Sequence, residues 1–179
     1  MYITGAFIIG HQMQGFENLT SPFLSILGIL GAILHILKVE GATNRSHYTF
    51  SFLIYGFTLL HFGLPEAILV VLVSNLAEWV WNRPAWYIQL FNISCYVISV
   101  AVAGATLTII NPAGTTANWQ AIAAIVLAMG GFTILNHLFV GIIVWMARRE
   151  NFKQSGIFSL IPLIIDLTMM SLGASMAIV

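Results

Sequence analysis

The chain has 179 residues, of which 59% are hydrophobic and only 7% charged, and its formal net charge is zero. Soluble domains carry about 25% charged residues, so a soluble fold of this size would lack the charges to cover its surface. The composition excludes an ordinary soluble protein and predicts a polytopic membrane protein. Six Lys and Arg residues balance six Asp and Glu residues, so no basic surface for nucleic acid is expected.

The single cysteine, Cys95, excludes an intrachain disulfide framework. The sequence contains no Cys/His cluster and no HExxH motif, so we expect no metal site. Residues 1–16 lack the basic start and small-residue cleavage site of a signal peptide. We interpret residues 1–20 as a short N-terminal stub, either a membrane-embedded segment or the remnant of a longer span.

Long apolar runs and the breaks between them predict an all-α membrane bundle of about six transmembrane helices in a single domain. The expected spans are 22–37, 48–62, 66–81, 87–110, 119–147 and 157–179. The second is short, since about 20 apolar residues normally cross a bilayer. The apolar runs are too long for membrane β-strands, and they lack the alternation of apolar and polar residues that such strands show.

With six spans in strict alternation, every basic residue falls on one side of the membrane: Lys38, Arg45, Arg83, Arg148, Arg149 and Lys153. The turn at Gly63-Leu64-Pro65 and the loop Asn111–Asn118 fall on the other side and carry none. The positive-inside rule makes the basic side cytoplasmic, in an inner membrane, and places residue 179 outside. A cytoplasmic output domain would need one more crossing after residue 179.

Several glycines lie within the expected spans, and we interpret them as positions of close helix packing. They are Gly28, Gly31, Gly104, Gly130, Gly131, Gly141 and Gly173.

Polar groups inside a membrane cost free energy, which makes each one a candidate for function. The candidate ligand-binding residues are Glu66, Asn75, Asn92, Asn136, His137 and Asp166. Asp166 is the strongest, because it lies about ten residues into the last span with no compensating charge on that helix. It must be protonated, paired across helices or hydrated. Its nearest expected partners are Asn92, Asn136 and His137.

Two acidic residues lie on the third span. Glu66 follows Pro65 in the first helical turn, where the helix dipole favours an acid, and a ligand or proton role is the alternative. Glu78 lies near the inner end, where we expect it to pair with Arg83, and Asn75 shares its helix face. Because Glu66 and Glu78 lie at opposite ends of one helix, they cannot form a catalytic pair.

His35, His61 and His137 are expected at different depths, which disfavours a pair of haem ligands, so no cofactor is expected. Nothing resembles a nucleophile elbow, a phosphate loop or a kinase motif. We therefore expect no catalytic residue and no enzymatic activity.

The stretches FGLPEAILVVLVSNLAEW and RPAWYIQLFN, followed by Asn136 and by Glu150-Asn151-Phe152, carry a resemblance that covers residues 48–179. The pattern resembles the multi-pass membrane input domain of bacterial HD-GYP phosphodiesterases and GGDEF diguanylate cyclases. That domain is itself similar to the substrate-binding component of energy-coupling-factor vitamin transporters. The resemblance implies a sensory or small-molecule-binding bundle and assigns no phosphodiesterase or cyclase activity to this chain.

Three interpretations remain open. The first is a sensory bundle that binds a small molecule among spans three to six and signals to a partner or output domain. The second is an accessory subunit of a larger, energy-converting membrane complex. The third is a transporter component, which predicts an externally open cavity near Glu66 and the Asn111–Asn118 loop. Membrane lipid, a small molecule, and a second copy or other membrane subunits are the expected partners.

Overall fold

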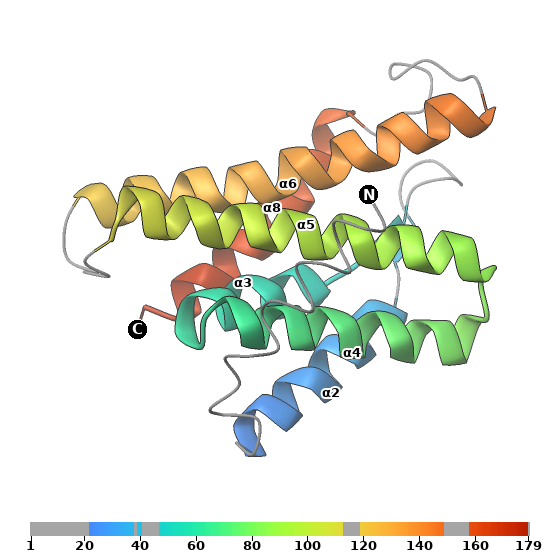
Figure 1. The fold of residues 1–179 in the computed structure, drawn as a ribbon, viewed down its shortest axis with the longest axis horizontal. Helices are drawn as coiled ribbons and strands as arrows, with labels where there is room; N and C mark the ends of the chain where they lie inside the picture. Colours follow the sequence, from blue (N-terminus) through green and yellow to red (C-terminus); the bar gives the residue numbers. More distant parts are fainter. Residues whose placement is uncertain (1–21, 38, 41–46, 113–118, 149–157, 179) are drawn as a thin grey trace.

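The computed structural model describes residues 22–37, 39–40, 47–112, 119–148 and 158–178. Helices make up almost all of this part of the chain (Figure 1). They are α2 (Pro22–Ile36), α3 (Ser51–His61), α4 (Leu64–Asn82), α5 (Trp86–Ile110), α6 (Trp119–Arg148) and α8 (Leu160–Met176). One antiparallel pair of two-residue strands, β1 (Val39–Glu40) and β2 (His47–Tyr48), lies between α2 and α3. The prediction of an all-α bundle is confirmed, whereas the N-terminal stub lies outside the described residues.

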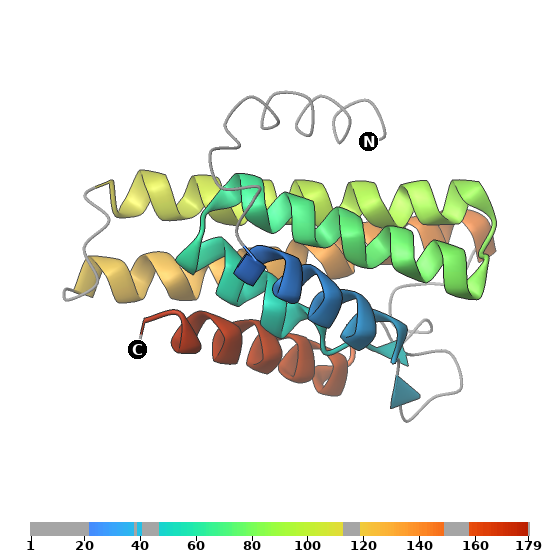
Figure 2. The ribbon, with the colours of Figure 1, turned by 90° about the horizontal axis from the view of Figure 1, so that it is seen from below.

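The helices pack around one another as a closed bundle. Helix α4 packs between α2 and α5, α5 packs along α6, and α8 packs against both α6 and α3 (Figures 1 and 2). Helices α4, α5 and α6 lie side by side with alternating direction. We name the two ends of the bundle by their connections. The turn between α4 and α5 lies at the Arg83 end, and α5 terminates at the Asn111 end.

Three helices, α4, α5 and α6, are long and apolar enough to cross a membrane, while α2, α3 and α8 are apolar but shorter. Helix α3 has only 11 residues, about 16 Å, against the roughly 30 Å of a bilayer core. The expected second span at 48–62 is shorter than predicted, because β2 occupies His47–Tyr48 and the helix begins at Ser51. Helix length alone therefore supports three crossings rather than six.

The outward faces of α2, α6 and α8 are apolar. Exposed residues include Phe23, Ile26, Ile29 and Ile33 on α2, Ile122, Val126 and Ile134 on α6, and Leu160, Ile161 and Ile164 on α8. Soluble monomers rarely expose apolar patches beyond a few hundred Å². Together with the three long apolar helices, these faces indicate a membrane protein.

Helices α3 and α8 touch backbone to backbone. A Cβ atom added at Gly173 would collide with the backbone oxygen of Leu53, and one added at Gly56 would collide with the backbone oxygen of Met170. Close packing was expected for Gly173 but not for Gly56. By contrast, nothing lies within 4 Å of a Cβ added at Gly130.

We expect Gly173→Ala to destabilise the protein by about 1–3 kcal/mol or more, because α8 must move away from α3 to admit the methyl group. Gly130→Ala is the matched control, and we expect it to change stability by no more than about 1 kcal/mol, with either sign. Denaturant unfolding of the two purified variants in the same micelles measures the difference. Equal stability of the two variants would contradict the backbone contact.

Candidate functional site: buried ion pairs and an apolar cavity

A buried polar cluster links three helices towards the Arg83 end. His35 on α2 contacts Glu78 on α4 through Nε2 at 3.0 Å and Ser51 on α3 through Nδ1 at 3.0 Å. His35, Ser51 and Glu78 are all buried. The expected pair between Glu78 and Arg83 is wrong, because α4 turns Glu78 inward to His35 while Arg83 is exposed at the helix C-cap.

Thr49 extends this cluster. Its hydroxyl donates to the backbone oxygen of Leu34 at 3.1 Å and lies 2.9 Å from the hydroxyl of Ser51. The Glu78 carboxylate accepts from His35 Nε2. The Ser51 hydroxyl contacts both His35 Nδ1 and Thr49. The hydrogen-bonded chain therefore links α2, α4 and the start of α3.

The order carboxylate, imidazole, hydroxyl is also that of an activated nucleophile. Ser51, however, has no exposed surface, and its hydroxyl already contacts both His35 and Thr49. A nucleophile must reach its substrate, so this geometry gives Ser51 no route to acyl transfer. We interpret the cluster as a clasp that holds the start of α3 between α2 and α4.

A second ion pair joins α6 to α8. His137 Nε2 lies 2.9 Å from Asp166 Oδ2, and both side chains are buried. Of the three partners expected for Asp166, the structure brings in His137. Asn136, which precedes His137 on α6, is also buried, but its Oδ1 has no hydrogen-bond partner among the described residues. Asn92 is half-buried, and among the described residues no hydrogen bond joins it to Asn136 or Asp166.

The remaining two candidates lie on α4. Asn75 is fully buried and donates to the backbone oxygen of Val71 at 2.9 Å, within its own helix. Its backbone oxygen accepts from Gln89 Nε2 at 2.6 Å, which ties α4 to α5. Glu66 is buried in the first turn of α4, as expected. It lies about 18 Å along the helix from Glu78, so the two acids are at opposite ends.

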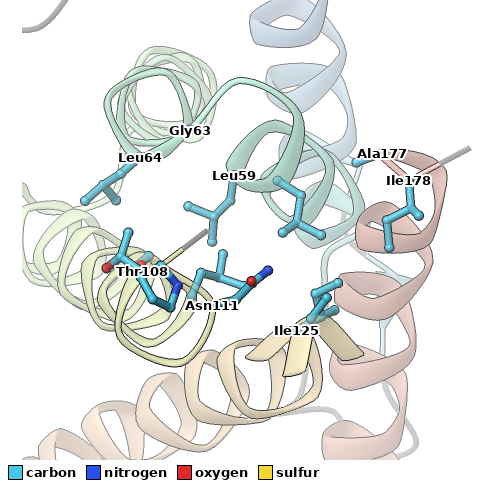
Figure 3. Close-up of a pocket in the computed structure, with 13 residues that line it drawn as sticks. Leu59, Gly63, Leu64, Thr108, Asn111, Ile125, Ala177 and Ile178 are labelled. Atoms are coloured by element: carbon cyan, nitrogen blue, oxygen red, sulfur yellow. Dashed lines mark hydrogen bonds between the residues drawn. The ribbon is translucent and has the colours of Figure 1, made fainter. Parts of the chain in front are cut away.

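A cavity of about 530 Å³ lies at the Asn111 end, away from both ion pairs (Figure 3). Four helices and the residues that follow α8 contribute to its wall: Leu59 and Leu60 from α3, Leu64 from α4, Gly104, Leu107 and Thr108 from α5, Ala121 and Ile125 from α6, and Ala177 and Ile178 after α8. Gly63, Asn111 and Pro112 complete it. Its size lies within the range of small-molecule sites, about 300–1,000 Å³.

None of the six predicted ligand-binding residues lines this cavity. Sequence reasoning selected polar groups within spans, whereas the cavity is walled by leucine, isoleucine, alanine and glycine side chains that look like ordinary core. The available signals were the helix-breaking stretches at Gly63 and at Asn111, which mark where neighbouring helices end at one level. The cavity lies where these ends meet.

No protein-family model matches the chain, and no curated protein or solved structure matches it either. The resemblance to cyclic-di-GMP input domains therefore still depends on the sequence pattern alone. Part of that pattern, Glu150-Asn151-Phe152, lies outside the described residues, as do the basic residues Lys38, Arg45, Arg149 and Lys153.

We expect Asp166→Ala to lower the free energy of unfolding by about 1–3 kcal/mol, because it leaves a buried His137 without its carboxylate. Asp166→Asn should cost less, since the amide oxygen still accepts from His137. Unfolding of both variants in micelles, alongside His137→Ala and the double variant, measures the coupling. If the double variant loses the sum of the two single effects, the pair does not connect α6 to α8.

Proposed function

We propose that this chain is a non-enzymatic, small-molecule-binding bundle of the bacterial inner membrane with a sensory role. The ligand occupies the cavity at the Asn111 end, and its binding changes helix packing that a partner or output domain detects. The observation that carries this proposal is the cavity itself, because four helices and the residues after α8 surround one space of ligand size.

The contrast between the two ends of the bundle supports a signalling mechanism. Towards the Arg83 end, buried histidine–carboxylate pairs join α2 to α4 and α6 to α8. At the Asn111 end the same core is hollow. A ligand that fills the cavity favours one arrangement of the five helix ends over others. The clasped parts of those helices then transmit the change as a rigid movement.

The proposed topology keeps six membrane segments, with the basic residues cytoplasmic and the Asn111 end external. Helix α3 is too short to cross alone, but α2, α4 and α8 pack around it. Backbone that is not helical is tolerated at membrane depth where protein covers it. The short α3 and the turn at Gly63 fit that condition.

The second candidate is a transporter component that binds its substrate from outside. The position of the cavity favours it, because Asn111, Pro112 and the start of α4 at Leu64 form part of the wall. That is the region where this interpretation predicted an opening. Residues 113–118 of the predicted loop lie outside the described part of the chain. Uptake of a probe into vesicles that contain this chain alone would favour transport over sensing.

Photolabelling tests the binding function. The purified full chain in nanodiscs is exposed to three diazirine-bearing octyl probes, one ending in an alcohol, one in a carboxylate and one in an ammonium group. Saturable labelling of cavity residues by any of the three, mapped by mass spectrometry, supports a binding site. Labelling that stays linear in probe concentration for all three, as for residues that face lipid, would refute it.

We expect Ile125→Trp to abolish saturable labelling, because the indole fills the α6 side of the cavity. Ile122→Trp is the matched control, since Ile122 lies one turn away on an exposed face of α6. The same residue types are exchanged in both variants, so a difference between them reports the cavity and not the tryptophan. Equal loss in both variants would contradict the assignment.

A further inference from the structure

We infer that the cavity takes a neutral amphiphile, with an apolar body and one hydrogen-bond-donating end such as a hydroxyl or amide, and rejects anions and cations of the same size. This inference rests on the proposed binding function and adds the chemical class of the ligand. Three independent features of the described residues lead to it: the lining chemistry, the helix ends and the position of Glu66.

Among the residues that the structure describes, the wall offers no counter-charge to an ionised ligand. All 13 residues that line the cavity are uncharged, and most are leucine, isoleucine, alanine or glycine. An ionised group that leaves water without a partner loses far more free energy than apolar contacts restore. Neutral, mainly apolar molecules avoid that cost.

The helix ends around the cavity disfavour negative charge in particular. Helices α3, α5 and α8 all end there, at His61, Ile110 and Met176, and contribute wall residues from their last turns or just beyond. Helix C-termini carry partial negative charge. Two helices, α4 and α6, begin at the same end, but α4 carries the acidic Glu66 in its first turn.

Glu66 lies behind the wall and offers no contact to a ligand. Its Oε2 lies 3.7 Å from the position of a Cβ on Gly63, a wall residue, yet Glu66 does not line the cavity. A cation in the cavity would find Glu66 behind Gly63, out of direct contact, so that its desolvation remains uncompensated.

One side of the cavity supplies hydrogen-bond acceptors. Thr108 lies on the wall next to Asn111 (Figure 3). Its hydroxyl donates to the backbone oxygen of Ala105 at 2.9 Å, which uses its hydrogen and leaves the oxygen able to accept. A ligand whose polar end donates, such as an alcohol or amide, meets this oxygen. The rest of its surface meets leucine and isoleucine.

The cavity reaches the outer surface of the bundle. Thr108, Pro112 and Ile178 are exposed wall residues, and Ile125 of α6 and Ile178 beyond α8 lie on separate walls (Figure 3). The surrounding outer faces of α6 and α8 are apolar. A neutral amphiphile dissolved in the bilayer can therefore enter from the side without crossing a charged rim.

Competition at fixed chain length tests the ligand class. The neutral diazirine octanol probe labels the chain in nanodiscs at neutral pH, and octanol, octanoate and octylammonium compete. We expect octanol to displace the probe at a concentration at least about tenfold lower than either ion. Displacement by octanoate or octylammonium at an equal or lower concentration would overturn the neutral class while leaving the binding function intact. Absence of any saturable labelling by the three probes would instead refute the binding function.

A matched pair of variants locates the polar end of the ligand. Thr108→Val keeps the shape of the wall and removes the accepting oxygen, so we expect octanol to compete about three- to tenfold less well. Thr106→Val is the control, because Thr106 makes a similar hydrogen bond to its own helix, to Val102 at 2.8 Å, and does not line the cavity. An equal effect of the two variants would overturn the assignment of Thr108.

Discussion

The short helix α3 is the constraint around which the bundle is built. An 11-residue helix exposes unpaired backbone groups at both ends, and at membrane depth these groups must be satisfied by protein. At its start, Thr49, Ser51 and His35 form the polar clasp with Glu78. At its end, the backbone oxygen of Thr58 accepts from both Phe62 and Gly63, which allows the chain to turn sharply into α4. Along its middle, Gly56 meets the α8 backbone, where Gly173 meets Leu53.

The cavity follows from the same shortness. Helices α5 and α6 have 25 and 30 residues and extend past the turn between α3 and α4 (Figure 1). Helix α3 ends before its neighbours do. Leu59, Leu60 and Gly63, at and just beyond its end, therefore line one side of the cavity. The His35 cluster fills the core towards the Arg83 end, whereas the Asn111 end contains the cavity with its mainly apolar wall. A bundle that is clasped at one end and unfilled at the other is suited to respond to a ligand, which is the basis of the proposed sensory function.

The buried charges serve packing more directly than binding. His35 and His137 each contact a carboxylate on another helix, and both pairs are buried. Replacing one partner leaves the other buried without its hydrogen bond, so such pairs specify one arrangement of helices even where their net contribution to stability is small. Of the six residues predicted to bind a ligand, Asn75, His137 and Asp166 form hydrogen bonds that join helices. The role of the others, such as Asn136 and Asn92, stays a prediction.

The amino-acid sequence by itself determined the apolar medium, the helical class, and the ends of helices at Gly63-Leu64-Pro65 and at Asn111, because composition and helix-breaking residues act locally. It also indicated that Asp166 needs a partner and offered three. Only the tertiary structure decided that His137 is that partner, that Glu78 turns to His35 instead of Arg83, and that α3 begins at Ser51. The two histidine–carboxylate pairs join residues 29 and 43 positions apart in the sequence. Their formation depends on how each helix is rotated against its neighbours. The sequence suggested a cavity near Glu66 and Asn111 in one interpretation, but only the tertiary structure decided which residues line it, since these are ordinary apolar residues that several helices bring to one level.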